Sequence, residues 1–233
     1  MIILLTMSKA VFISGFLYGL SDNIIPFLDK DTDLFVHSWQ TEENSRWIKK
    51  LERYKKYCNE TTFLFTKPEH KRKRISYLQS TWYATNLIKD PYKYKSIVKF
   101  KPDLDTDVIT YKEDMKNSFR KAYLQSQPLL NKTIKEECVY GYIHYKSIDE
   151  RVFTCYPYVI DKMFQDDGTR SYHKGFMNEA INLDKKLQYW IAKEYEGSLL
   201  WSELFEYYNI EQIQDINLKL PNNKQWQSKE QKN

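Results

Sequence analysis

The sequence has 233 residues and a formal net charge of +5, and 16% of its residues are aromatic. That length and aromatic content are enough to bury a core, which excludes an intrinsically disordered chain. Three cysteines without C-x-x-C spacing and four isolated histidines argue against a disulfide framework and a zinc site, so we expect reduced thiols in a cytoplasmic, nonsecreted protein.

The amino-terminal segment is apolar but lacks the layout of an export signal. Its basic residue, Lys9, follows the first apolar patch, and no small-residue cleavage site comes after it. The uncharged run 10–21 is too short to span a bilayer. We therefore predict that residues 1–7 form an extension and that the folded domain begins at residue 8.

The first hundred residues alternate between apolar runs and amphipathic segments. The expected strands are 9–14, 33–39, 61–65 and 96–100, and the expected helices are 21–29, 45–58 and 70–89. Strands that alternate with helices over short connections are typical of a parallel sheet. The predicted fold class is therefore α/β, with a mainly parallel central sheet and helices on both faces.

The second half has a less regular pattern. The expected strands are 139–145 and 152–158, and the expected helices are 178–195 and 198–208, with Gly197 as a break between them. No internal repeat or shift in composition marks a second domain. We predict one domain over residues 8–220 and a disordered polar tail over 221–233.

A basic block occupies residues 46–74, where eleven Lys or Arg and three acidic residues give a balance of +8. Such a block favours an anionic partner, which allows a peripheral membrane contact. A solvated, lysine-rich helix face explains the same composition, and both interpretations stay open.

The stretch VKFKPDLDTD (98–107) places aspartates on alternate positions directly after a predicted strand. Asp103 and Asp105 of an extended segment face the same way, and two crowded carboxylates repel unless a cation neutralises them. Mg²⁺ or Mn²⁺ fits such oxygen ligands. A calcium loop is excluded because Val108 stands where its turn needs glycine, whereas a solvated turn capped by aspartates stays open.

Four segments carry a resemblance to a known family. They are FISGFLYG (12–19), DLFVHSWQ (33–40), RISYLQSTWYATNLI (74–88) and IVKFKPDLD (97–105). In this order they resemble the GT-A nucleotide-sugar glycosyltransferases, particularly small enzymes of bacterial lipopolysaccharide synthesis and of large DNA viruses. The first resembles the turn that opens the nucleotide pocket, and the last resembles the D-x-D metal signature.

The resemblance implies a single GT-A (Rossmann-like) domain, with a nucleotide-sugar-binding half at 8–107 and an acceptor half at 108–220. It implies metal-dependent transfer of a hexosyl or deoxyhexosyl group from a nucleotide-diphosphate sugar to a glycan hydroxyl. The metal ligands would be Asp103 and Asp105. The donor-binding residues would be Ser14, Gly15, Lys71, Arg74, Gln79, Lys99, Asp103 and Asp105. Lysines at 99 and 101 stand where such enzymes usually carry arginine, which loses the bidentate fork for phosphate.

An inverting reaction needs a carboxylate that takes the proton of the acceptor hydroxyl. The candidates are Asp161 in YPYVIDKMF and Glu203 in WSELF, although helix capping or an ion pair explains either residue as well. Two other classes stay open: a noncatalytic transferase-like scaffold and a basic, aromatic nucleic-acid binder. The second class lacks a recognisable motif, so we expect no nucleic-acid partner.

Overall fold

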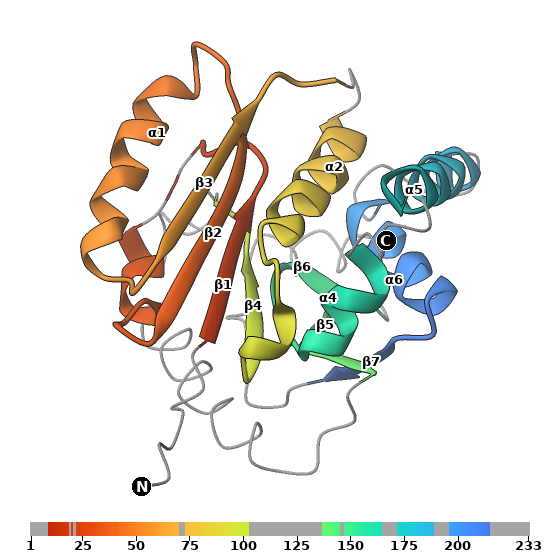
Figure 1. The fold of residues 1–233 in the computed structure, drawn as a ribbon. Helices are drawn as coiled ribbons and strands as arrows, with labels where there is room; N and C mark the ends of the chain where they lie inside the picture. The colour runs from red at the N-terminus through yellow and green to blue at the C-terminus, as the bar shows by residue number, and fades with distance from the viewer. Residues whose placement is uncertain are drawn as a thin grey trace, which may run out of the picture.

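The computed structural model describes residues 9–18, 20, 22–69, 73–102, 137–144, 147–164, 172–188 and 196–214. These residues form one seven-stranded sheet with helices packed on both of its faces (Figure 1). The predicted α/β class is therefore confirmed. No helix within those ranges has both the length and the apolarity to cross a membrane.

The sheet has the strand order β3-β2-β1-β4-β6-β5-β7. Its strands are β1 (Lys9–Ser14), β2 (Thr32–Trp39), β3 (Thr61–Thr66), β4 (Ser96–Phe100), β5 (Cys138–His144), β6 (Ser147–Cys155) and β7 (Glu211–Gln214). The first four strands are mutually parallel, β6 runs antiparallel to both of its neighbours, and β7 is parallel to β5. The sheet is thus mainly parallel, as the strand-helix alternation predicts.

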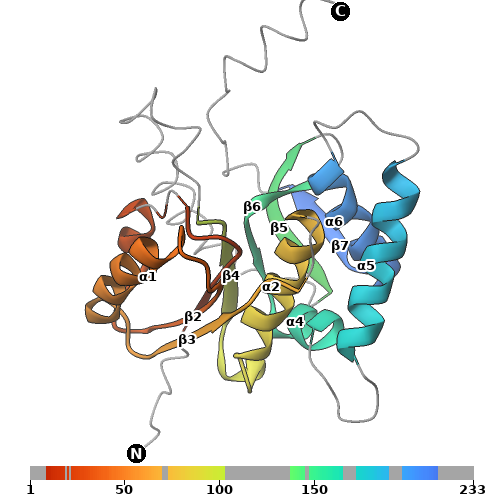
Figure 2. The ribbon, with the colours of Figure 1, turned by 90° about the horizontal axis from the view of Figure 1, so that it is seen from above.

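The helices form two unequal layers. They are η1 (Asp22–Phe27), α1 (Ser45–Leu51), η2 (Glu52–Lys56), α2 (Lys73–Asn86), η3 (Pro91–Lys93), α4 (Pro157–Phe164), α5 (Tyr172–Gln188) and α6 (Glu196–Tyr207). Figures 1 and 2 show α1 on one face of the sheet and α2, α4, α5 and α6 on the other. Because helices cover both faces, the central strands β1, β2 and β4 are buried along almost their whole length instead of alternating between buried and exposed residues.

Each layer encloses its own apolar core. The core beneath α1 contains Val11, Ile13, Val36 and Tyr54, together with residues of the turn after β1. The larger core beneath α2, α4, α5 and α6 contains strand residues such as Phe12 of β1 and Phe153 of β6, and helix residues such as Trp201 and Phe205 of α6. Phe153 packs edge-on against Phe12, Trp201 and Phe205, with ring centroids 5.8–6.3 Å apart. Buried aromatic pairs of this kind stabilise the core beyond the area they bury.

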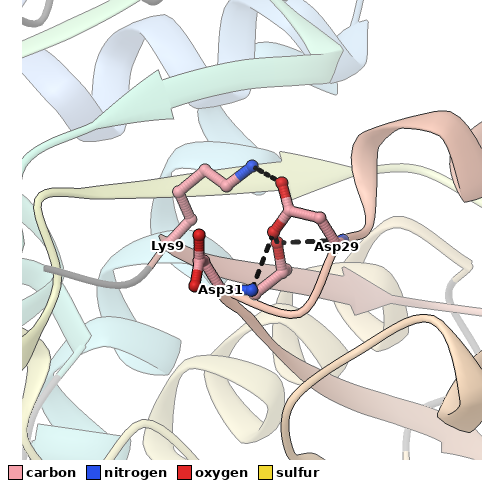
Figure 3. Close-up of polar contacts among 4 residues, drawn as sticks. Lys9, Asp29 and Asp31 are labelled. Carbon is pink, nitrogen blue, oxygen red and sulfur yellow. Dashed lines mark hydrogen bonds and ion pairs between the residues drawn. The ribbon is translucent and has the colours of Figure 1, made fainter. Parts of the chain in front are cut away.

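Polar contacts hold the amino ends of the parallel strands. Lys9 Nζ lies 2.6 Å from Asp29 Oδ2, and the other carboxylate oxygen of Asp29 accepts hydrogen bonds from the backbone N–H of Asp31 and from the Thr32 hydroxyl (Figure 3). Burial works to raise the pKa of Asp29, but the bonds from Lys9 and Thr32 outweigh it and lower that pKa. This turn fixes where β2 begins.

The second half differs from the sequence-based prediction in four elements. Residues 157–164 form helix α4, although 152–158 reads as a strand, because Pro157 begins the helix with its fixed φ. Helix α5 begins at Tyr172 rather than at 178, and Gly197 lies in the first turn of α6 rather than in a break. The short strand β7 was not predicted; Asn209, with φ of 53°, turns the chain from α6 towards it. The predicted tail at 221–233 lies outside the described residues.

Candidate functional site

The carboxyl ends of β1 and β4 form a topological switch point. β2 pairs with one edge of β1, and β4 pairs with the other edge, with Ile13 opposite Phe100. In open α/β sheets, ligands bind beyond the carboxyl ends of strands at such a reversal. The turn after Ser14 and the chain leaving β4 at Lys101 and Pro102 meet at this point, which makes it the candidate site.

Gly15 follows β1 with a φ of 105°, a backbone conformation that a residue with a Cβ rarely adopts. Its N–H donates to Ser80 Oγ at 2.6 Å, and its carbonyl oxygen accepts from Ser38 Oγ at 2.7 Å. A Cβ added at Gly15 would lie 3.1 Å from the Tyr77 ring. The turn is therefore held from β2 and from α2, and it leaves no space for a side chain.

A row of hydroxyl groups on α2 faces these strand ends. The Thr81 and Ser14 hydroxyls lie 2.8 Å apart, and Ser80 Oγ lies 2.7 Å from His37 Nδ1. The other ring nitrogen of His37 lies 2.9 Å from Thr66 Oγ1 on β3. One hydrogen-bonded chain thus connects β1, α2, β2 and β3 at the carboxyl edge.

His37 is an interior histidine, as its position in β2 suggests. Its side chain is fully buried, and burial lowers its pKa to about 3 although the charge of Glu69 works in the opposite direction. The ring therefore stays neutral near pH 7, when one nitrogen donates and the other accepts. This makes His37 a structural link between Ser80 and Thr66.

Beside His37 lies a second polar cluster formed by Glu69, Gln79 and Tyr83. The Glu69 carboxylate accepts hydrogen bonds from Gln79 Nε2 at 2.6 Å and from the Tyr83 hydroxyl at 2.7 Å. Burial, followed by the bond to Glu69, raises the pKa of Tyr83 to about 12. The buried Oε1 of Gln79 has no hydrogen-bond partner among the described residues. Gln79 thus lies next to the switch point but is tied to Glu69.

An aromatic pair borders the turn on its β2 side. The rings of Phe16 and Tyr18 stack with their centroids 5.3 Å apart, and the Tyr18 hydroxyl donates to Glu43 at 2.5 Å. Asn44 also holds the turn, since its Oδ1 accepts a hydrogen bond from Leu17 N at 3.0 Å. Tyr18 therefore occupies a polar, partly exposed position at the rim of the candidate site.

Lys99 does not lie on an open surface. Its side chain is fully buried, and Nζ donates to the Tyr77 hydroxyl. The ammonium group also lies 4.9 Å from the centroid of the Tyr77 ring, 5.6 Å from that of Phe153 and 5.9 Å from that of Trp201. Aromatic faces stabilise a desolvated cation, so these three rings form a cage for the charge. Sequence reasoning predicts Lys99 as a donor-binding group, whereas the structure places it beneath Tyr77.

The two predicted metal ligands, Asp103 and Asp105, lie outside the described residues, and so does Lys71. Arg74 belongs to the first turn of α2, but its side chain is not described. Within the described part of the chain, no group of three or more His, Cys, Asp or Glu residues is placed to hold a metal ion. The metal assignment therefore stays a prediction.

The two predicted proton acceptors each have a partner on a neighbouring element. Asp161 is exposed on α4 and accepts from the Tyr92 hydroxyl of η3 at 3.1 Å. Because η3 precedes β4, Asp161 lies at the amino edge of the parallel strands, opposite to Gly15. Glu203 lies on α6 with an ion-pair distance of 3.5 Å to Lys186 of α5. The structure therefore does not bring Asp161 to the candidate site, and it pairs Glu203 with a neighbouring helix.

The basic block is also partly neutralised. Helix α1 and η2 carry much of it on the face opposite to α2 (Figure 2). Lys50 lies 3.3 Å from Asp22, and Lys55 lies 2.5 Å from Glu52. Surface pairs of this kind contribute little to stability, but they reduce the positive charge that is open to a partner.

Sequence reasoning missed the residues of α2 that support the turn, namely Tyr77, Ser80 and Thr81. A signal for them exists, since the hydroxyl residues of the helix recur near helical spacing at Ser76, Ser80, Thr81 and Thr85, and all four are buried. Buried hydroxyls need hydrogen-bond partners, so a row of them on one helix face indicates a polar contact with the sheet.

Comparisons with known proteins found relatives only at the level of structure. No protein-family model matches the chain, and a search of curated proteins gave no match. Among solved structures, the apo form of the glycosyltransferase GlyE from Streptococcus pneumoniae TIGR4 matches with a TM-score of 0.51 and 8% identity, over 91% of this chain and 46% of the GlyE chain. This chain thus spans about half of the GlyE chain.

Further solved structures also match. A second structure of GlyE has a TM-score of 0.49 and 8% identity over 91% of this chain and 46% of that one. The apo form of mouse xyloside xylosyltransferase 1 has a TM-score of 0.40 and 9% identity over 88% of this chain and 84% of that one. The match to apo GlyE shows that the described α/β domain has a fold found in a glycosyltransferase.

Proposed function

We propose that this protein transfers a glycosyl group from a nucleotide-diphosphate sugar to a hydroxyl group of a glycan, with Mn²⁺ or Mg²⁺ as cofactor. The observation that carries the proposal is the glycine turn at Gly15, which lies beside the end of β4 at the switch point. The D-x-D sequence of Asp103 and Asp105 follows β4 directly in the chain. The likeness in fold to apo GlyE supports the same class of protein.

The residues of the site have separate roles in this proposal. Ser14 and Gly15 let the backbone approach the nucleotide closely, because Gly15 carries no side chain. Asp103 and Asp105 hold the cation, which when bound neutralises the negative charge of the departing diphosphate. Arg74, in the first turn of α2, and Lys71, which comes before that helix in the sequence, supply further positive charge.

We further propose a hexosyl or deoxyhexosyl donor and a glycan or glycoconjugate acceptor. The polar residues that the structure gathers at the carboxyl edge, including His37 and Ser80, keep the turn rigid rather than react themselves. A preformed turn binds its donor without first having to become ordered, which lowers the entropic cost of binding.

A thermal-shift screen of UDP-, GDP-, CMP- and dTDP-sugars with Mn²⁺ tests the proposal. A donor that binds only the folded protein raises its melting temperature by mass action. We expect at least one donor to do so, and we expect excess EDTA to abolish both that shift and hydrolysis or transfer of the sugar. A chain that responds to none of these donors is not a transferase of this class.

Asp103→Ala and Asp105→Ala test the metal ligands. Each variant should lose transfer while keeping the melting temperature of the unliganded protein, because a ligand carboxylate is needed only for the cation. Asp107→Ala is the matched control, since it removes the third acid of the same sequence and should stay active. Full activity of either ligand variant would remove the metal assignment.

A further inference from the structure

The bond between Lys99 and Tyr77 links the two strand ends of the switch point. Lys99 belongs to β4, and its Nζ donates to the hydroxyl of Tyr77 on α2. The ring of Tyr77 in turn lies against Gly15 at the end of β1, where it would contact an added Cβ at 3.1 and 3.4 Å. Lys99 thus contacts Tyr77, and Tyr77 in turn contacts the Gly15 turn; these three residues form a series from β4 to β1.

Tyr77 is the member of this series that reaches both strands. Helix α2 packs against β1 and β2. The Ser80 hydroxyl accepts a hydrogen bond from Gly15 N, and the Thr81 hydroxyl is hydrogen-bonded to that of Ser14. Tyr77 lies one helical turn closer to the start of α2, and it is only partly buried. Its ring therefore supports the turn from the side on which β4 ends.

Lys99 fixes that ring in place. Its ammonium group is fully buried and is enclosed by the rings of Tyr77, Phe153 and Trp201. Because the register pairs Lys99 with Phe12 of β1 and with Phe153 of β6, its position is fixed by strands on both sides. A hydrogen bond from a charged donor is stronger than a neutral one, so the Tyr77 hydroxyl is held at a fixed place.

We propose that Tyr77, held by Lys99, is a positioning residue that sets the shape of the Gly15 turn for the nucleotide of the donor. The inference rests on the proposed function and adds to it a role for two residues that do not touch the reacting atoms. A turn that is rigid before binding favours the donor, and releasing the ring would loosen the turn.

Two substitutions remove the bond without removing the packing. Tyr77→Phe keeps the ring against Gly15 and loses the hydroxyl, and Lys99→Met keeps an unbranched apolar stem and loses the charge. Each should raise the donor KM about tenfold or more, with kcat within about threefold of the wild type, because binding and not chemistry is weakened. The donor KM of the double variant should be no higher than that of the more strongly affected single variant, since both substitutions remove the same bond.

Tyr158 and Lys162 provide the matched control. Lys162 Nζ lies 5.2 Å from the centroid of the partly buried Tyr158 ring, on α4, which begins at the amino edge of the parallel strands. Tyr158→Phe should leave the donor KM unchanged. A lower melting temperature of the unliganded protein without a change in donor KM would show that the Lys99–Tyr77 bond is merely structural, and it would overturn the inference.

The measurement uses the full chain, Mn²⁺ and whichever nucleotide sugar gives the largest thermal shift with the wild type. If Lys99→Met fails to fold, Tyr77→Phe alone decides, because it retains the buried ring. A wild type that binds a donor, with Tyr77→Phe binding it equally well, overturns this inference and leaves the proposed function standing. A wild type that binds no donor overturns both.

Discussion

Acidification should destabilise this protein through His37 before its carboxylates titrate. The folded protein keeps His37 neutral down to about pH 3, whereas an unfolded chain protonates it at its ordinary pKa of 6.5. The unfolded state therefore binds more protons between these two values. The stability that His37 contributes is complete above pH 6.5 and is lost as the pH falls towards 3.

The size of the effect follows from the two pKa values. At pH 5, the free energy of unfolding should be roughly 2 kcal/mol lower than at pH 7, since each pH unit below 6.5 costs about 1.4 kcal/mol. The ring is fully buried, with its two nitrogens 2.7 Å from the Ser80 hydroxyl and 2.9 Å from the Thr66 hydroxyl. Burial of the ring disfavours its charged form, and this desolvation is the physical reason for the resistance to protonation.

Urea unfolding followed by tryptophan fluorescence at pH 7 and pH 5 measures this loss, and His37→Gln is the control. Glutamine keeps a donor and an acceptor but cannot titrate. The variant should be less stable at pH 7, and the difference from the wild type should narrow by roughly 2 kcal/mol at pH 5. His70, His144 and His173 are present in both proteins and cancel. An equal loss in the free energy of unfolding between pH 7 and pH 5 in the wild type and in His37→Gln would refute the reasoning.

Two further substitutions test the turn and the amino edge. Gly15→Ala should lower the free energy of unfolding by about 2–4 kcal/mol, because alanine is strained at a φ of 105° and its Cβ meets Tyr77. Adding Tyr77→Ala should relieve only the steric contact with the new Cβ. A Gly15→Ala protein as stable as the wild type would contradict the positive φ of Gly15. Asp33→Asn should cost about 1–3 kcal/mol in urea unfolding, because the fully buried carboxylate accepts from Tyr94 at 2.8 Å and pairs with Lys93 at 3.1 Å. The exposed Asp31→Asn serves as its control and should change little.

The parallel half of the sheet could be predicted because its strands are marked in two ways. The segments β1 and β4 are apolar runs that end in Gly15 and Pro102, residues that stop a strand. The start of α4 was missed because Tyr158 has high β propensity and continues the apolar run of β6, although Pro157 is a residue that favours the first turn of a helix. Strand propensity in a short apolar segment does not show which neighbours will cover it.

The candidate site was predictable only where the sequence marks it locally. Ser14 and Gly15 stand at the end of an apolar run, so their position at the carboxyl edge follows from the strand alone. The support from Tyr77 depends on how α2 docks over β1, which no local pattern encodes. Asp161 was predicted from its aromatic neighbours, but helix α4 carries it to the amino edge. Lys99 was expected to bind the donor because the resemblance places it in the strand before the D-x-D sequence, where arginine is usual; its burial among aromatic rings is not marked in the sequence.

The four residues of β7 decide what the sheet presents at its outer border. Glu211 and Gln212 place polar side chains there, and the strand covers the backbone of Cys138 to Gly141 in β5. The seven residues of β5 include no acidic residue, lysine or arginine. Without β7, the β5 backbone from Cys138 to Gly141 would lose the partner strand that the structure gives it, and an unpaired strand edge of low charge favours aggregation.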